Sequence, residues 1–446
     1  MRDYRRVADS VAADIASGRL RPGDRLPTQR AFARRLGIAD STAGRVYAEL
    51  TRRGLVVGEV GRGTFVRAAA PAASPALAEP ALARIDLELN YPVVAGQTEL
   101  LAAGLARLSR PDVLAAALRP AGATGTPAAR AAVTALLARP GWAPDPDTVL
   151  FAGNGRQAIA AAIAALVPAG GRLGVEALTY PVVKAVAARL GVTAVPLACD
   201  ADGLVPEAVR AAHVASPLGA VYVQPTLHNP LAVTMPGSRR AELADVLRES
   251  GLVAIEDAIW SFLHPDAAPP LAAYAPERVV FADSLSKRLA PGLTLGFALT
   301  PPELAGRVVG ALRSGAWTVT GYALEAATGW LTDGAAATVA AAKREDAAAR
   351  QRIAAAALAG CALRSDPHAY FCWWELPEPW RADTFVAAAA RRGIAVTPAA
   401  SFVVGPHRTP NAIRLGLASP PPETLRQALG TLAALARSDP DDMSAD

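Results

Sequence analysis

The sequence predicts a small basic domain at the N-terminus, joined by a linker to a large α/β domain. Residues 1–67 carry fourteen arginines against seven acidic residues, whereas residues 68–446 sum to a net charge of −2. Residues 68–85 are rich in alanine and proline and have almost no charge, which is typical of a semi-extended linker. From residue 86, short apolar runs alternate with helical stretches, which indicates a mostly parallel sheet covered by helices on both faces.

Length and composition narrow the class of protein. A chain of 446 residues has room for two or three domains with a large core. No run approaches the roughly 20 apolar residues of a membrane span, and no apolar core of signal-peptide type follows the basic N-terminus, so a cytoplasmic location is expected. The cysteines Cys199, Cys361 and Cys372 and the five histidines lack the spacing of a metal site, so no metal is expected.

The N-terminal 67 residues predict a winged helix-turn-helix, whose basic charge suits a polyanion such as DNA. Thr28 is expected to cap the second helix, and Asp40 or Ser41 the third, because short polar side chains accept hydrogen bonds from the N–H groups at helix starts. The expected elements are helices over residues 4–17, 28–36 and 41–53 and strands over residues 55–57 and 61–66.

Six short motifs in this segment resemble the GntR-type winged helix domain: LPTQR at 26–30, LGI at 36–38, ST at 41–42, YAEL at 47–50, RGLV at 53–56 and GRGTFV at 61–66. The resemblance implies that the third helix enters the major groove and the wing the adjacent minor groove. It implies DNA contacts from Arg30, Ser41, Thr42, Arg45, Arg62 and Gly63. Asp40 stands where family members usually have a basic residue, so either the operator differs or Asp40 serves only as the helix cap.

The α/β domain is expected to span residues 86–437, with a disordered tail over 438–446. Strands are predicted at 148–152, 172–175, 194–197, 220–223, 253–256 and 279–282, and helices at 157–167, 182–190 and 238–250. A smaller α+β segment is expected to close the domain around residues 371–376 and 412–417.

Lys287 is the residue around which this domain is organised. The chain has 45 lysines and arginines, but only three are lysines, and a lysine amine can form an imine with a carbonyl whereas a guanidinium cannot. Lys287 follows the predicted strand 279–282, at the edge where α/β sheets bind ligands. Ser284 and Ser286 before it, and a Pro-Gly turn after it, suit a phosphate beside the amine.

Loops after other strands offer complementary chemistry. The turn at 153–157 leads into a helix whose N-terminus can hold a phosphate. Tyr180 offers a flat face to a pyridine ring, and Asn229 offers an amide to a phenolic oxygen. Asp257 ends an apolar strand, where a carboxylate is costly to bury unless it is paired with a cation such as a protonated pyridine nitrogen.

In order and spacing, these loops resemble the fold-type I, pyridoxal 5'-phosphate (PLP)-dependent aminotransferases over residues 86–437. The resemblance implies an internal aldimine at Lys287, pairing of Asp257 with the pyridine nitrogen, a bond from Asn229 to the ring oxygen and stacking of Tyr180. It implies that Gly155, Gln157, Ser284 and Ser286 hold the phosphate and that Arg414 clamps an α-carboxylate.

Two positions depart from this pattern. Thr294 replaces an arginine that usually contacts the phosphate. The negative charge of the phosphate is therefore neutralised by Arg288 or is neutralised less completely. Ile259 and Trp260 stand where a tyrosine usually bonds the ring oxygen, and an indole cannot act as a phenol does. Both departures put the affinity and electronics of the cofactor in question.

A GntR-type winged helix joined to an aminotransferase-like domain is the arrangement of the MocR family, which this chain resembles over nearly its whole length. The resemblance implies a transcriptional regulator that binds double-stranded DNA, forms a head-to-tail homodimer and senses an amino acid or amine by transaldimination at Lys287. Two alternatives stay open. One is a working aminotransferase. Thr294, Trp260 and the intact DNA-binding domain argue against steady turnover, but an aminotransferase-type half-reaction stays open. The other is a sensor of PLP itself that controls vitamin B6 metabolism.

Overall fold

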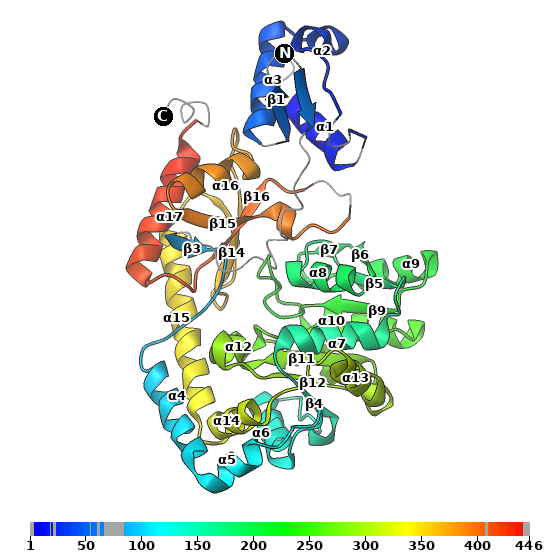
Figure 1. Cartoon of the computed structure of the whole chain (residues 1–446), viewed down its shortest axis with the longest axis vertical. Coiled ribbons are helices and arrows are strands. Elements are labelled where there is room, and N and C mark those ends of the chain that lie inside the picture. Colours follow the sequence, from blue (N-terminus) through cyan, green and yellow to red (C-terminus); the bar gives the residue numbers. More distant parts are fainter. Residues whose placement is uncertain are drawn as a thin grey trace.

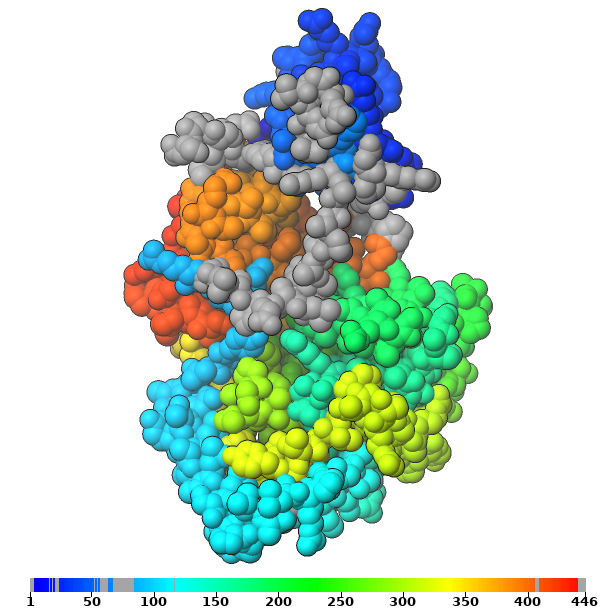
Figure 2. All heavy atoms as spheres, in the orientation of Figure 1, coloured from blue at the N-terminus to red at the C-terminus, as the bar shows by residue number. Residues whose placement is uncertain are grey.

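The computed structural model describes residues 4–17, 19–20, 24–53, 55–59, 63–66, 84–405 and 409–439. Figure 1 shows a winged helix at one end, a small domain beside it and a large α/β domain beyond, which confirms the predicted fold class. Figure 2 shows the same succession on the molecular surface. The predicted linker lies outside the described residues except for Arg84 and Ile85, and Ile85 already belongs to a strand. Of the predicted tail, only Ser438 and Asp439 are described.

The winged helix has the predicted order of elements: α1 (Tyr4–Ala16), α2 (Gln29–Leu36), α3 (Asp40–Arg52) and the antiparallel strands β1 (Val56–Glu59) and β2 (Gly63–Val66). Its core includes Phe32 of α2 packed edge-on against Tyr47 of α3, with ring centroids 5.3 Å apart. The predicted cap of α2 is confirmed, because the Thr28 side chain accepts a hydrogen bond from the Ala31 N–H.

The predicted cap of α3 is wrong. The N-cap residue is Ala39, whose side chain can make no capping bond, and both Asp40 and Ser41 lie inside the first turn. Asp40 still stabilises the helix there, because its carboxylate lies near the positive end of the helix dipole.

The large domain is built on a seven-stranded sheet in the order β4-β12-β11-β10-β9-β5-β6. All pairings are parallel except those of β12, which runs antiparallel to both β4 and β11 and was not predicted. The strands are β4 (Val149–Ala152), β5 (Arg172–Glu176), β6 (Thr193–Leu197), β9 (Ala220–Val223), β10 (Ala254–Asp257), β11 (Val279–Ser284) and β12 (Gly296–Leu299), with a short hairpin of β7 (Cys199–Asp200) and β8 (Gly203–Leu204).

Helices cover both faces of this sheet, as predicted. Alternate residues of β9 separate into two cores, with Val221 and Val223 in one and Ala220 and Tyr222 in the other. The helices of this domain are α4 (Gln97–Ala106), α5 (Pro111–Ala117), α6 (Pro127–Leu137), α7 (Gly155–Leu166), α8 (Pro181–Arg189), α9 (Pro206–Ala215), α10 (Gly237–Ser250), α11 (Leu271–Tyr274), α12 (Leu285–Arg288), α13 (Pro302–Ser314) and α14 (Gly321–Thr332).

The small domain contains a five-stranded sheet in the order β13-β14-β16-β15-β3, and the long helix α15 connects it to the large domain (Figure 1). Its strands are β3 (Ile85–Leu87), β13 (Ala362–Ser365), β14 (Phe371–Glu375), β15 (Ile394–Pro398) and β16 (Ala412–Gly416), and its helices are α15 (Ala335–Ala357), α16 (Ala382–Arg391) and α17 (Pro422–Arg437). β3, the first strand after the linker, pairs with β15 and so belongs to the small domain. Among the described residues, no helix combines the length and apolar character needed to cross a membrane.

Candidate functional site

Lys287 lies on the short helix α12, directly after β11. Its Nζ donates a hydrogen bond to the backbone carbonyl of Asn90 at 2.5 Å. It also lies 4.9 Å from the ring centre of Tyr91 and 5.4 Å from that of Trp260, so two aromatic faces border the amine. The side chain is half-buried.

The surroundings of Lys287 favour its neutral form. Burial, together with the nearby cations Arg156, Arg414 and Lys343, lowers the pKa of the amine to about 7. A substantial fraction of the amine is therefore unprotonated near neutral pH, which is the form that attacks a carbonyl carbon.

Lys343 of α15 is a site residue that the sequence did not reveal. It is fully buried, and its Nζ donates to the carbonyls of Lys287, at 2.9 Å, and of Leu289. Lys184 binds two carbonyls in the same way, those of Ser401 at 2.8 Å and Val403 at 2.7 Å. The other two lysines thus bind backbone carbonyls from buried or half-buried positions, so the scarcity of lysine does not by itself single out Lys287.

A cluster of hydroxyl groups lies beside the N-terminus of α7. The Ser284 hydroxyl donates to Ser286 Oγ at 3.0 Å, and Ser286 in turn shares a hydrogen bond with Thr294 Oγ1. A Cβ atom on Gly155, the first residue of α7, would lie 3.1 Å from Ser284 Oγ, so the helix start and the hydroxyls are adjacent. Three of the predicted phosphate ligands thus come together, and Thr294 adds a third hydroxyl.

Gln157, the fourth predicted phosphate ligand, lies in the first turn of α7, where its N–H donates to the Asn154 side chain at 3.0 Å. A Cβ atom on Gly153 would lie 2.4 Å from Gln157 Oε1, so the Gln157 side chain folds back over the turn.

Arg288 does not reach this cluster. Its Nη2 donates to Asp283 Oδ2 at 2.8 Å, both side chains are buried, and the guanidinium lies over the Phe262 ring. A buried carboxylate needs its cation, so Arg288 is already paired, and the expected neutralisation of a phosphate by Arg288 has no support in this geometry. Arg156 lies in the first turn of α7, at the helix start beside this cluster, and its Nε donates to the Tyr180 hydroxyl at 3.2 Å.

Asp257 ends β10, next to the strand that leads to Lys287, and is held by three donors. Its carboxylate accepts hydrogen bonds from the Tyr222 hydroxyl at 2.6 Å, Gln224 Nε2 at 2.9 Å and the Ile259 N–H at 3.1 Å. Burial raises the pKa of Asp257 to about 6 despite these bonds. Gln224 Oε1 accepts from the Asn229 N–H, so one side chain connects two predicted site residues. Tyr222 and Gln224 were not predicted.

Asn229 and Arg414 have buried atoms without partners. Among the described residues, Asn229 Oδ1 and Arg414 Nε are shielded from solvent and make no hydrogen bond. Arg414, on β16, donates through Nη2 to the carbonyl of Glu88 and to Thr397 Oγ1, and lies over the Phe402 ring. Burial lowers the pKa of Arg414 to about 10. None of the ion pairs within the described part of the chain includes Arg414, so this buried cation can accommodate an anion.

One segment of chain contacts both ends of this site. Residues 88–91 directly follow β3, and they supply the Glu88 carbonyl to Arg414, the Asn90 carbonyl to Lys287 and the Tyr91 ring above the amine. Backbone acceptors leave no mark in a sequence motif, so this segment was not predicted.

Trp260 fills the position where a phenol was expected. It is buried, and its ring lies 6.3 Å from Tyr370 and 5.7 Å from Phe371 of the small domain. Trp260 therefore packs the two domains together beside Lys287.

On the winged helix, the predicted DNA contacts lie on α2, α3 and the wing. Arg30, Ser41 and Arg45 are exposed, and Thr42 is half-buried. Arg62 lies outside the described residues. Gly63 has φ of +120°, and a Cβ atom there would lie 2.7 Å from Arg25 Nε, so glycine is required at this point of the wing.

Charged side chains connect the winged helix to the small domain. Arg53, which follows α3, donates to Glu49 at 2.7 Å and Asp9 at 2.8 Å, and it lies 3.5 Å from Asp383 of α16. Asp9 of α1 also pairs with Arg381, the N-cap of α16, at 3.0 Å. The two domains thus contact each other through ion pairs.

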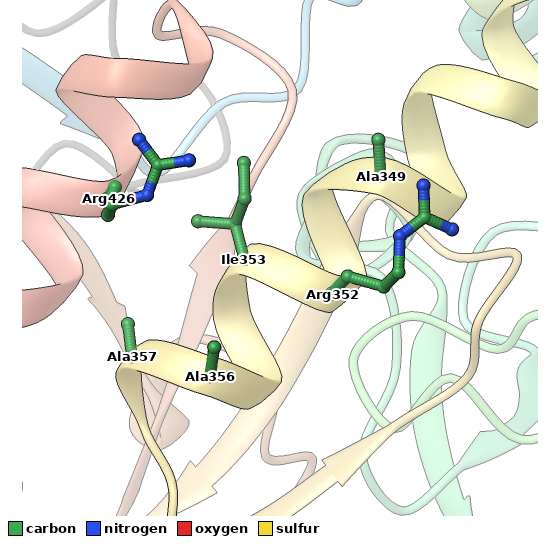
Figure 3. A pocket seen from close by; sticks show the side chains of 6 residues that line it. All are labelled: Ala349, Arg352, Ile353, Ala356, Ala357 and Arg426. Atoms are coloured by element: carbon green, nitrogen blue, oxygen red, sulfur yellow. The ribbon is translucent and has the colours of Figure 1, made fainter.

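A separate hollow lies between α15 and α17 (Figure 3). It has an apolar floor with one arginine on each helix, and it is lined by Ala349, Arg352, Ile353, Ala356, Ala357 and Arg426. None of these belongs to the site around Lys287.

Comparison with known proteins agrees with this division of the chain. Residues 119–432 match the family model of aminotransferases class I and II, and residues 3–66 match that of the bacterial regulatory proteins of the gntR family. The uncharacterized HTH-type transcriptional regulator YdeF of Bacillus subtilis is 30% identical over 97% of this chain and 94% of its own length.

Two further curated relatives cover about two thirds of each chain. The regulator TauR of Rhodobacter capsulatus is 30% identical over 68% of this chain and 68% of its own. The pyridoxine biosynthesis regulator PdxR of Corynebacterium glutamicum is 25% identical over 69% of this chain and 68% of its own.

Solved structures show the fold of the larger part. A multiple substrate aminotransferase from Thermococcus profundus has a TM-score of 0.72 at 20% identity, over 82% of this chain and 93% of that chain. An archaeal alanine:glyoxylate aminotransferase has a TM-score of 0.71 at 22% identity, over 79% of this chain and 90% of that chain.

Proposed function

Because the chain belongs to the family of transcriptional regulators that join a GntR-type DNA-binding domain to an aminotransferase class I and II domain, we propose that it binds PLP at Lys287 and senses an amino acid or amine there. The observation that carries the proposal is the pairing of β10 with β11, which brings Asp257 and Lys287 to one edge of the sheet. One offers a buried carboxylate and the other an amine of lowered pKa.

The residues around Lys287 fit the parts of PLP. The hydroxyls of Ser284, Ser286 and Thr294, with the start of α7, form a cradle for a phosphate. When bound, PLP supplies an aldehyde that condenses with amines and a ring that stabilises negative charge. Asp257 would keep the ring nitrogen protonated. Asn229 Oδ1 is buried and has no hydrogen-bond partner among the described residues, so its amide is available for a polar group of a ligand.

The effector class follows from Arg414. This buried guanidinium has no carboxylate partner within the described residues, so a ligand carboxylate would bind there with two charge-assisted hydrogen bonds. An α-amino acid could then present its amine to the aldehyde in competition with Lys287. Steady turnover is not part of the proposal.

The contacts of residues 88–91 suggest how binding reaches DNA. A ligand that binds Arg414 and the cofactor aldehyde competes with Glu88 and Asn90, whose carbonyls now bind Arg414 and Lys287. These residues lie next to the linker, and the winged helix also contacts the small domain through Arg53. Movement of the small domain would therefore change the position of the winged helix on its operator.

A homodimer would place two winged helices on one operator. Leu100 of α4, Leu114 of α5 and Tyr322 of α14 are 38%, 41% and 52% exposed, and α14 packs on both α4 and α5. Exposed apolar side chains on neighbouring helices favour burial against a second copy of the chain.

The first experiment is a visible absorption titration of cofactor-stripped protein with PLP, for wild type and Lys287→Ala. We expect a saturable band in wild type, loss of that band in Lys287→Ala, and its retention in the control Lys184→Ala. Amino acids are then screened for a change in the band, and the active ones are tested for an effect on operator affinity by fluorescence anisotropy. A protein without any Lys287-dependent band would refute PLP binding at this site.

A second candidate is a sensor of PLP itself, which the likeness to the pyridoxine biosynthesis regulator favours. The same anisotropy experiment separates the two functions. In a PLP sensor, the cofactor alone changes operator affinity and amino acids have no further effect.

A further inference from the structure

Two histidines and an aspartate that are distant in the sequence meet where the large and small domains join. His264 follows the turn 261–263 of the large domain, and Asp366 and His368 lie in the loop between β13 and β14 of the small domain. The two imidazole rings stack with centroids 4.0 Å apart and planes at 15°. One ligand atom from each residue lies within 4.8 Å of the others, and all three side chains are half-buried. This grouping is not apparent from the spacing of the histidines along the sequence.

The hydrogen bonds among the described residues leave one ring nitrogen of the cluster without a partner. Asp366 Oδ1 accepts from the His368 N–H at 2.8 Å and lies 2.9 Å from His368 Nδ1. Within the described part of the chain, His264 Nδ1 is shielded from solvent and makes no hydrogen bond. A buried polar atom without a partner costs about 1–3 kcal/mol. The fold thus maintains an unfavourable arrangement unless a ligand binds this nitrogen.

The His264 loop is held in place by contacts that do not involve the cluster. Arg139 donates to the carbonyls of Pro265, at 2.7 Å, and Ala267, at 2.5 Å, on the two sides of Asp266. The N–H of Ala267 in turn donates to the His264 carbonyl at 3.2 Å. These bonds fix the backbone that carries His264 on the large-domain side of the cluster.

We propose that His264, Asp366 and His368 bind a divalent transition-metal cation of the Zn²⁺ class, which ties the large domain to the small domain. Two imidazoles and a carboxylate are a common set of protein ligands for Zn²⁺, with bonds of about 2.0–2.2 Å and a fourth position left for water. At such bond lengths the donor atoms lie about 3.5 Å apart. The stacked rings must therefore turn toward the ion when it binds.

The link has a structural consequence. One ligand, His264, lies on the large domain, four residues after Trp260, whose ring contacts small-domain rings, and the other two lie on the small domain itself. A bound ion would favour the domain arrangement in which these residues are close together. It would do so without contacting Lys287, and hence independently of the proposed PLP site.

The test uses full-length protein stripped of metal by a chelator and titrated with Zn²⁺ in a calorimeter at pH 7.5. We expect one ion per chain with a dissociation constant in the micromolar range or tighter. His264→Ala and His368→Ala should weaken binding at least tenfold. His213→Ala is the matched control, because His213 accepts a hydrogen bond from the Leu218 N–H outside the cluster and should leave binding unchanged.

A second measurement guards against misfolded variants. Zn²⁺ should raise the thermal unfolding midpoint of wild type and His213→Ala, but not of His264→Ala or His368→Ala, all four having the same circular dichroism spectrum. Absence of stoichiometric binding to wild type would overturn the proposal. So would equal binding to all variants, which would place the ion elsewhere, for example on the cysteines.

Discussion

Lys343 should make the stability of the protein depend on pH in a defined window. It is fully buried, and burial lowers the pKa of its amine from 10.5 in the unfolded chain to about 7. Since the unfolded state binds the proton more tightly, folding releases it between these two values, and the free energy of unfolding rises with pH there. Below pH 7 both states are protonated, and the contribution is constant.

The magnitude follows from the two pKa values. Each pH unit between them corresponds to about 1.4 kcal/mol, so the full effect is ~5 kcal/mol. Between pH 7.0 and 8.5, wild type should gain about 1.5–2 kcal/mol that Lys343→Met does not gain. Methionine also leaves the carbonyls of Lys287 and Leu289 without this donor, at about 1–3 kcal/mol each, but that cost does not vary with pH.

The assay is urea unfolding of cofactor-free protein, followed by tryptophan fluorescence at pH 6.0, 7.0, 7.75 and 8.5. The quantity compared is the difference in unfolding free energy between wild type and Lys343→Met, in which titrating groups that do not interact with Lys343 cancel; Lys287 does interact, so the comparison is repeated in a Lys287→Met background. A difference that stays constant from pH 7.0 to 8.5 would refute the reasoning. It would mean that the two carbonyls and Asp346 keep the buried amine charged.

Two other substitutions test the separate domains. If Arg30 reads a base, Arg30→Ala should weaken binding to the specific operator by about 1–3 kcal/mol; if it contacts phosphate, binding to all sequences should weaken by a similar factor. Fluorescence anisotropy with specific and random duplexes distinguishes these results. Unchanged binding would show that Arg30 is not part of the DNA interface. Asp257→Asn should weaken PLP binding at least tenfold, or about 1.4 kcal/mol, because an uncharged amide cannot pair with a protonated ring nitrogen. A spectral titration measures this affinity. An unaltered affinity would contradict the proposed role of Asp257.

The sequence was most informative where chemistry and chain direction coincide. Lys287 and Asp257 each follow an apolar run, so their place at the edge of the sheet could be predicted. The pairing of Arg288 with Asp283 could not be foreseen, because neighbouring residues on a helix point about 100° apart and only the fold shows that α12 directs Arg288 to the buried Asp283. β12 was missed because only the four-residue helix α12 and a short turn separate it from β11, so the alternation of strands with long helices is interrupted there.

Other parts of the site depend on contacts that a sequence does not display. Tyr222 has the position of an ordinary core residue in β9, and only the pairing of β9 with β10 shows that its hydroxyl meets Asp257. His264 and His368 are separated by about a hundred residues, and the fold alone brings their rings together.

In the proposed mechanism, residues 88–91 would form a short path from the ligand to the DNA-binding domain. The carbonyls of Glu88 and Asn90, which a ligand would displace, belong to a segment that lies only a few residues after the linker. The free energy needed to break the bonds of the Glu88 and Asn90 carbonyls is subtracted from the binding free energy of the ligand. By reciprocity, if operator binding changes the position of residues 88–91, it changes the affinity of the ligand as well. Sensitivity to the effector would then be adjustable by substitutions in residues 84–91 that touch neither ligand nor DNA.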